Sequence, residues 1–145
     1  MGGTGPATGE QMRLPTKIAI MSLCALLAGC VATAPPFGDL KSAREACNRD
    51  YPPRIGNYLP HARCVNAAIE TYALPGARHP DLVRLQAEVR ASLSEKVDRH
   101  RLSVSAGERR MAEADRLVAA AQREREAGNN SAASKRVAAI EEMLR

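Results

Sequence analysis

Residues 80–97 read PDLVRLQAEVRASLSEKV, and this stretch decides the fold of the chain. Its first residue is a proline, which suits the first position of a helix, and Asp81 places an acid in the first turn. Apolar side chains then recur at intervals of three and four residues, the spacing that gathers them on one helix face. The stretch therefore predicts a helix that begins at Pro80 and buries one face. That face consists of Leu82, Leu85, Val89, Leu93 and Val97.

The residues after Val97 allow two architectures. The same spacing continues through His100, Val104, Gly107 and Met111 toward residue 121, which would give one long rod. The narrow stripe of such a rod suits a coiled coil formed by self-association. Residues 102–107 (LSVSAG), however, contain few good helix formers, and their serines are suited to capping a new helix. We therefore favour a turn near residues 100–105, with the rod as the alternative.

Two further helices are predicted after this turn. The first starts at Ser103 or at the capping box of Ser105 and Glu108, and it runs to about Ala127. Its charged side chains, which include Arg109, Glu113 and residues 123–126, are expected on the solvent side. The residues Gly-Asn-Asn at 128–130 then stop the helix, and Ser131 begins the last one. The inward-facing residues are Met111, Ala114, Leu117, Val118 and Ala121 in one helix and Ala133, Val137, Ile140 and Leu144 in the other. Short connections predict that residues 77–145 form a small bundle of antiparallel helices.

Residues 39–76 are predicted to form a short helical hairpin. Asp39 or the capping box from Ser42 to Glu45 starts a helix that the Tyr-Pro-Pro sequence at 51–53 ends near residue 50. A loop over 54–59 leads to a second helix, which starts near Pro60 and continues to about residue 73. Its expected inward face is Cys64, Ala67, Ala68, Thr71 and Tyr72.

The fold class is therefore all-α, with no strand pattern after residue 38. Aromatic side chains are scarce: the chain has one Phe, three Tyr and no Trp. A core made of small aliphatic side chains is thin, which favours elongated helical packing over a thick globular core.

The beginning of the chain carries a different signal. Basic Arg13 and Lys17 precede an apolar run over 18–27, which is roughly half the ~20 residues that span a bilayer. The run ends in Leu27-Ala28-Gly29-Cys30, which resembles the lipobox of bacterial lipoproteins at every position. The resemblance implies that residues 1–29 are a signal peptide and that Cys30 carries acyl chains such as palmitate. Because residues 1–11 do not fit a signal peptide, we expect translation to start at Met12.

The same resemblance indicates where the mature chain works. Residues 30–38 would be the lipidated cysteine and a flexible tether. Val31 stands where inner-membrane lipoproteins of many Gram-negative bacteria have aspartate, which favours the outer membrane with the domain facing the periplasm. In this oxidising compartment Cys47 and Cys64 are expected to form a disulfide. A zinc site made by these cysteines with His61 and His79 is the less favoured alternative.

No arrangement of residues indicates catalysis, a cofactor or a metal centre. Positive and negative charges alternate along the mature chain, which does not favour nucleic-acid binding. We therefore expect a non-enzymatic interaction or scaffold module, attached to the membrane by its lipid. Its partner would be an envelope protein, peptidoglycan or a second copy. The alternative is a periplasmic inhibitor or small-ligand-binding lipoprotein that uses the hairpin, with Arg54, Tyr58 and His61 as the contact surface.

Overall fold

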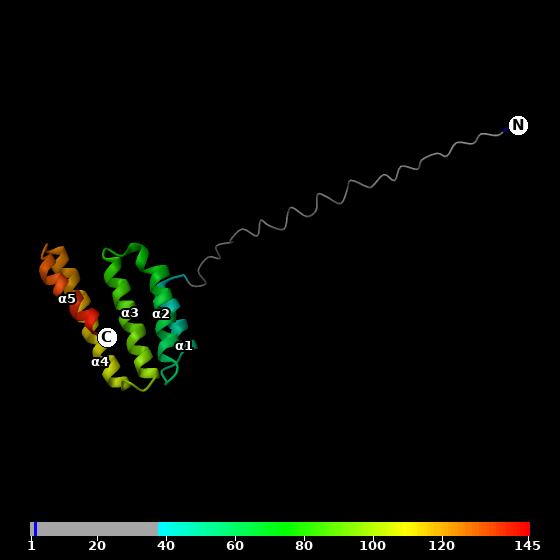
Figure 1. The fold of residues 1–145 in the computed structure, drawn as a ribbon, viewed down its shortest axis with the longest axis horizontal. Coiled ribbons are helices and arrows are strands. Elements are labelled where there is room, and N and C mark those ends of the chain that lie inside the picture. Colours follow the sequence, from blue (N-terminus) through cyan, green and yellow to red (C-terminus); the bar gives the residue numbers. More distant parts are fainter. Residues whose placement is uncertain (1, 3–37) are drawn as a thin grey trace. The chain divides into compact units, whose positions relative to one another are not determined.

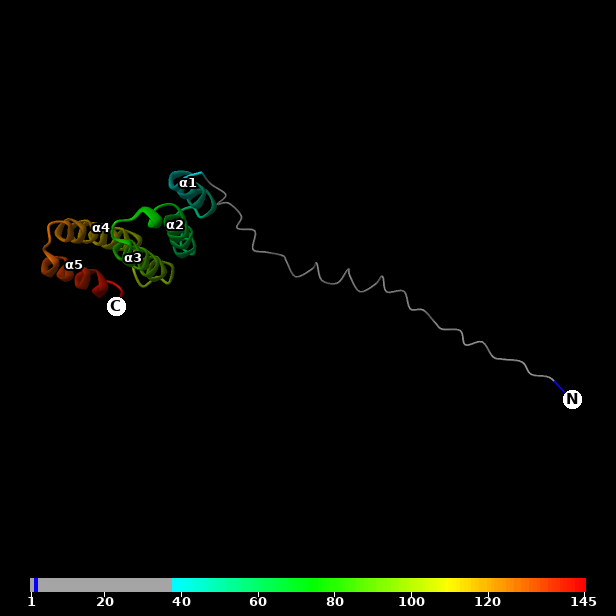
Figure 2. The ribbon, with the colours of Figure 1, turned by 90° about the horizontal axis from the view of Figure 1, so that it is seen from above.

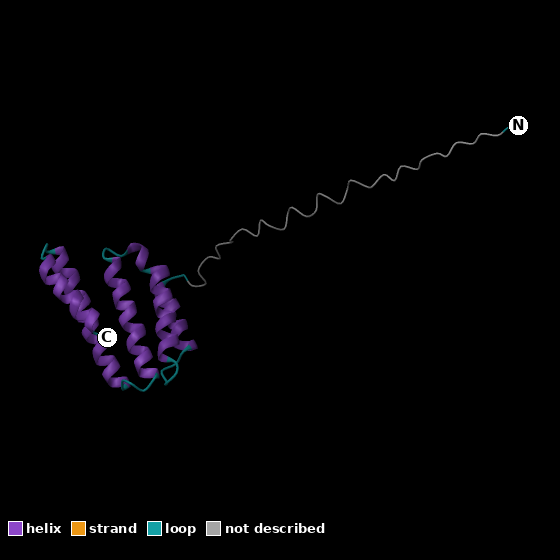
Figure 3. Cartoon of the chain, in the orientation of Figure 1, coloured by secondary structure: helices purple, strands orange, loops and turns teal. Residues whose placement is uncertain are grey.

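Five α-helices and one 3-10 turn make up the regular structure of the computed structural model, which describes residue 2 and residues 38–145 (Figure 1). No strand occurs in these residues, so the predicted all-α class is confirmed (Figure 3). The elements are α1 (Leu40–Asp50), α2 (Tyr58–Tyr72), the 3-10 turn η1 (Leu74–Gly76), α3 (Pro80–Asp98), α4 (Val104–Glu126) and α5 (Asn130–Glu142).

Helices α1 and α2 form the predicted disulfide-linked hairpin. The Cys47–Cys64 bond is present, with the two Cα atoms 5.7 Å apart. Asp39 is the residue that caps α1, because its carboxylate accepts the backbone N–H of Ser42 at 2.8 Å. A small core surrounds the bond, and it consists of Cys47, Val65 and Ile69 with Leu40, Cys64, Ala73 and Val83 packed around them.

Helix α3 is the central element. It packs against α2, α4 and α5, and it lies between α2 and α4 in both ribbon views (Figures 1 and 2). Its predicted apolar stripe is confirmed, since Leu82, Val89, Leu93 and Val97 are at most 4% exposed and Leu85 is partly buried. The larger core joins this stripe to Ala114, Val118 and Ala121 of α4 and Ile140 of α5.

The chain turns between α3 and α4, as favoured from the sequence, so the continuous rod is excluded. The N–H groups of Arg101 and Leu102 both donate to the carbonyl of Lys96, which closes the end of α3. His100 makes the reversal with a φ of 56°. Ser103, rather than Ser105, caps α4 by accepting the N–H of Ala106 at 3.2 Å.

Helix α5 returns along α4. Gly128 adopts a φ of +76° and Asn129 caps α5, so the helix begins at Asn130, one residue before the predicted start. At the other end, the Lys96 ammonium donates to the carbonyls of Met143 and Leu144 at 3.3 and 3.5 Å. This contact ties the last turn of α5 to α3.

Two details of α2 differ from the prediction. The helix starts at Tyr58, because Asp98 of α3 accepts the free N–H groups of its first turn and extends it by two residues. The predicted inward face was only partly correct: Ala68 is buried and Cys64 and Tyr72 are partly buried, whereas Ala67 and Thr71 are exposed. The buried face is instead Ala62, Val65, Ala68 and Ile69, because the larger aliphatic side chains set the rotation of the helix.

The acidic and basic residues near the end of α4 are not a plain solvent face. Arg125 pairs with Asp81 of α3 at 2.7 Å, and Glu124 pairs with Arg136 of α5 at 3.3 Å. Glu126 reaches Arg78 at 3.2 Å. The predicted solvent side is confirmed for Arg123 and Glu126, which are exposed, but Glu124 and Arg125 are partly buried because neighbouring helices place opposite charges beside them.

Candidate functional site

The loop between α1 and α2, residues 51–57, carries the exposed large hydrophobic side chains of the described residues. Among the residues that the structure describes, the exposed large hydrophobic side chains are Tyr51 (36% exposed) and Ile55 (45% exposed), and both lie on this loop. Loops held on a rigid scaffold commonly carry binding residues, and exposed apolar side chains can contribute to such a surface. The loop is therefore a candidate interaction surface.

A cleft of about 370 Å³ lies beside this loop. Tyrosine and proline side chains supply its apolar surface, and amide, imidazole and carboxylate groups supply its polar surface. It draws on the end of α1, the loop, the start of α2 and the first turns of α4, so it joins the hairpin to the bundle. We name it the tyrosine–proline cleft. Its lining residues are Asn48, Tyr51, Pro52, Pro53, Asn57, Tyr58, His61 and Glu108.

Asp98 at the end of α3 fixes the loop. Its carboxylate accepts the backbone N–H groups of Gly56, Tyr58 and Leu59 at 2.7, 3.2 and 2.8 Å. Asn57 stands at the N-cap position of α2 but makes no capping bond, so the more distant Asp98 performs that role. The loop and the α3–α4 turn accordingly lie at the same end of the molecule (Figure 1).

Two further contacts make the loop rigid. The side-chain amide of Asn57 donates to the carbonyl of Pro52 at 2.9 Å, which closes the loop on itself. Gly56 adopts a φ of +90°, a conformation that other residues reach only with strain. The Cys47–Cys64 disulfide joins the two helices close to the cleft, because Cys47 is next to Asn48 in α1 and Cys64 is three residues after His61 in α2. The cleft is thus preorganised before any ligand arrives.

His61 lies in the cleft as a neutral group. Its Nε2–H donates to Asn48 Oδ1 at 2.7 Å, which links α2 to α1 across the cleft. Burial of the ring lowers the pKa of His61, and the nearby cation of Arg90 lowers it further. Because the ordinary pKa of histidine is already below 7, the ring is uncharged at neutral pH.

A smaller apolar groove of about 130 Å³ adjoins the cleft between α3 and α4. Tyr58 and Glu108 line both spaces. Arg90 lines the groove, but its guanidinium donates to Asn66 Oδ1 at 2.5 Å. Burial lowers the pKa of Arg90. The remaining lining residues of this groove, which we name the α3–α4 groove, are Leu93, Ser94, Val97, Val104, Gly107 and Met111.

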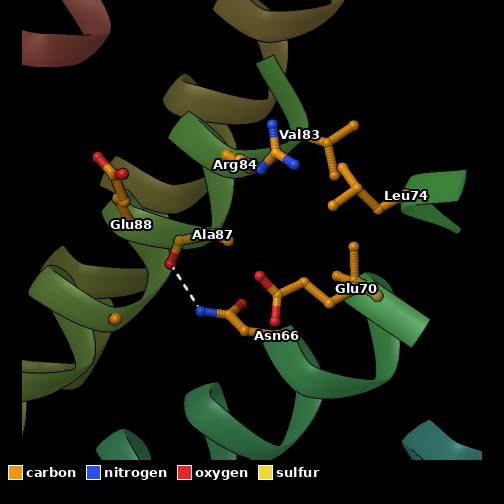
Figure 4. Close-up of a pocket in the computed structure, with 9 residues that line it drawn as sticks. Asn66, Glu70, Leu74, Val83, Arg84, Ala87 and Glu88 are labelled. Atoms are coloured by element: carbon orange, nitrogen blue, oxygen red, sulfur yellow. Dashed lines mark hydrogen bonds between the residues drawn. The ribbon is translucent and has the colours of Figure 1, made fainter. Parts of the chain in front are cut away.

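A third hollow, of about 280 Å³, separates α2 from α3 (Figure 4). Leu74 and Val83 face each other across one end, and the amide of Asn66 donates to the carbonyl of Ala87 at 2.8 Å. Glu70, Arg84 and Glu88 add charged groups. Acidic and basic side chains both line this hollow, so it does not favour a ligand of one charge. Tyr51 and Ile55, the exposed large hydrophobic residues, do not line it.

The contact surface predicted from the sequence is only partly assembled. Tyr58 and His61 line the cleft, whereas Arg54 is exposed on the loop and does not line it. Sequence reasoning missed Glu108 and Asp98, which come from other helices. Asp98 directly follows Val97, so the sequence places it at the end of the predicted helix. No local pattern, however, indicates that its carboxylate binds the loop before α2.

The other predicted site residues have different outcomes. Cys47 and Cys64 are bonded to each other, so the alternative zinc site loses its two thiolates. The described residues contain no group of three side chains that could hold a metal ion. His79 precedes α3 and is partly buried. Cys30 and, apart from residue 2, the signal peptide predicted over residues 1–29 lie outside the described residues. No helix of the described part is long and apolar enough to cross a membrane.

No protein family matches the chain, and no curated protein or solved structure shows significant similarity to it.

Proposed function

We propose that the chain is a membrane-anchored envelope lipoprotein and that its helical domain is a non-enzymatic interaction module. The anchor is supported by Leu27-Ala28-Gly29-Cys30, which has the small residues and terminal cysteine of a lipobox. Two or more acyl chains give stable membrane attachment, since each buried methylene contributes ~0.8 kcal/mol. The disulfide fits an oxidising compartment, as expected for a domain that faces the periplasm from the outer membrane.

The interaction role depends on one observation, the preorganised tyrosine–proline cleft with its exposed loop. Tyrosine presents a large apolar surface with a polar tip, which suits a surface that binds a partner. The cleft contains one carboxylate and one histidine, and that histidine is bonded to Asn48. No serine, cysteine, threonine or lysine lines it, and its histidine and carboxylate are not hydrogen-bonded to each other as a nucleophile and its base would be. These features support binding rather than catalysis.

A second candidate function is that of a periplasmic inhibitor or small-ligand-binding lipoprotein. The volume of the cleft, about 370 Å³, favours it, because small-molecule sites occupy ~300–1,000 Å³. Both candidates use the same cleft and differ in the size of the occupant. Identification of the bound species separates them.

Lipid attachment is tested by labelling growing Gram-negative cells with an alkyne analogue of palmitate. The wild-type chain should take up the label and sediment with the outer membrane, and Cys30→Ala should lose both properties. Cys24→Ala is the matched control, because it removes a cysteine that precedes the expected cleavage site. Equal labelling of wild type and Cys30→Ala would refute the anchor.

The interaction role is tested by placing a photo-crosslinking amino acid at exposed Ile55. We expect one major crosslinked species in intact cells. The same amino acid at Ser131 on α5, which is exposed and lies outside the cleft, should not give that species. Identical crosslinking patterns from the two positions would contradict an interaction surface at the loop. Mass spectrometry of the species would distinguish a protein partner, peptidoglycan and a second copy.

A further inference from the structure

The charge of the cleft contrasts with the charge of the chain. The whole sequence has a formal net charge of +5 at pH 7, yet no lysine or arginine lines the tyrosine–proline cleft. Its one formally charged lining residue at neutral pH is Glu108, since burial and Arg90 keep His61 neutral. Glu108 forms no ion pair within residues 38–145. A single carboxylate without a partner, beside two tyrosines, is complementary to a cation.

The apolar part of the cleft suits the stem of a long basic side chain. Lysine and arginine pack their methylene groups on apolar surface while the charged head reaches a polar partner. Tyrosine rings attract cations at their faces, and Tyr51 and Tyr58 both line the cleft. Pro52 and Pro53 add rigid apolar surface beside them. A small inorganic cation would use Glu108 but none of this apolar surface.

The adjoining α3–α4 groove indicates what lies next to the basic residue. Tyr58 and Glu108 line both spaces, so the two spaces adjoin and one extended ligand can reach both. The groove is predominantly apolar, and its volume of about 130 Å³ exceeds the ~30 Å³ of a water molecule several times. It therefore accommodates one apolar side chain. A ligand that fits both spaces has a basic residue, which occupies the cleft, next to an apolar residue, which occupies the groove.

We propose that the tyrosine–proline cleft binds an extended peptide segment of a partner protein through a lysine or arginine that pairs with Glu108 and a neighbouring apolar side chain that enters the α3–α4 groove. This inference rests on the proposed interaction role and names the chemistry of the partner. Aromatic-lined grooves are a common way to bind extended peptides. The cleft itself loses little conformational freedom on binding, because the disulfide and Asp98 already hold the loop.

The test selects random peptides displayed on phage against the full-length chain purified in detergent. We expect the retained peptides to be enriched about tenfold in lysine or arginine followed by an apolar residue. Glu108→Gln should abolish the enrichment in basic residues, because it removes the charge and keeps the shape. Glu88→Gln, in the hollow between α2 and α3, is the matched control and should retain it. Both variants should melt at the wild-type temperature, since both side chains are exposed.

Two results would overturn the inference. One is a set of retained peptides without enrichment in basic residues, or no retained peptide at all. The other is an enrichment that Glu108→Gln leaves unchanged. Either result leaves the proposed function standing if Cys30 is lipidated and Ile55 still crosslinks to a partner. Loss of crosslinking at Ile55 in the wild-type chain, by contrast, would remove the interaction role itself.

Discussion

Asp98 holds a loop that lies 42 residues earlier in the chain, at Gly56. Its carboxylate satisfies three backbone N–H groups that the first turn of α2 and its loop leave free. A carboxylate at a helix N-terminus also interacts favourably with the helix dipole. One side chain on the central helix thus determines both where α2 begins and how the tyrosine–proline cleft is shaped.

Asp98→Ala should therefore lower the free energy of unfolding by about 1–2 kcal/mol, the range for loss of a helix cap. Urea denaturation measures the change. Hydrogen exchange should become faster at residues 56–59 and remain unchanged in α5. Asp50→Ala is the control, because Asp50 is an exposed acid at the end of α1 without a side-chain hydrogen bond in the described residues. An equal effect of both substitutions would contradict the capping role.

His61 makes the stability of the hairpin depend on pH. Burial first, and then Arg90, lower the pKa of His61 below 6.5 in the folded state. As the pH falls through 6.5, the unfolded chain binds a proton that the folded chain does not, so the free energy of unfolding decreases. The stabilisation is present above the unfolded pKa and is lost as the pH falls below it.

Thermal melting of the wild type at a series of pH values from neutral to mildly acidic should show this decrease. His61→Gln should flatten the dependence, because glutamine keeps a donor for Asn48 and does not titrate. His100→Gln is the control, since His100 is exposed at the α3–α4 turn. A pH dependence that survives His61→Gln would show that another group is responsible.

At the scale of elements, the contact between α3 and α4 depends on Gly107. A Cβ atom built at this position lies 2.9 Å from Cγ2 of Val97, closer than real Cβ atoms approach a neighbour. Val97 is buried and branched at Cβ, so its methyl group has little freedom to move away. The absence of a side chain at 107 therefore permits the two helices to approach closely near their shared turn.

Gly107→Ala should destabilise the protein despite the higher helix propensity of alanine. Overpacking costs ~1–3 kcal/mol, and the propensity gain offsets up to ~1 kcal/mol, so we expect a net loss of about 1 kcal/mol. Gly76→Ala is the matched control, because a Cβ there has no neighbour within 4 Å. Chemical denaturation of both variants checks the difference. Stabilisation by Gly107→Ala would mean that Val97 moves without cost.

The same elements show how far sequence reasoning reaches. The α3 stripe, the cap at Asp39, the turn before α4 and the disulfide were predicted correctly, because each depends on local spacing or on chemistry within the hairpin. The rotation of α2 was predicted wrongly, because Ala67 and Thr71 follow the helical period as well as the buried residues do. Only the larger volumes of Val65 and Ile69 distinguish the two faces.

The cleft was harder to predict than the helices. Tyr58 and His61 were named because they lie near an obvious turn, but the carboxylate that faces them is on α4, at Glu108. Its sequence context is a capping box, so the local pattern assigns it another role. Side chains that meet across helices have no local signature, and packing alone brings them together.

At the scale of the whole molecule, two hydrophobic cores share one helix. The larger core joins α3, α4 and α5, and the smaller core joins α1 and α2 around the disulfide. Adjacent residues of α3 connect them, since Leu82 belongs to the larger core and Val83 packs against the smaller one. The smaller core is built from few side chains, so its stability depends more strongly on the covalent bond.

Replacing both cysteines with alanine should therefore affect the two cores unequally. The bond joins positions 17 residues apart, and its loss should lower the free energy of unfolding by about 3 kcal/mol in the chain-entropy model. Hydrogen exchange should show α1 losing protection first, while the buried amides of α3 and α4 stay protected until global unfolding. Asp50→Ala, a change at an exposed position of α1 that keeps the disulfide, is the control for local substitution effects. Equal loss of protection in α1 and α4 would instead mean that α3 couples the two cores into one cooperative unit, and the cleft between them would then be disrupted only by global unfolding.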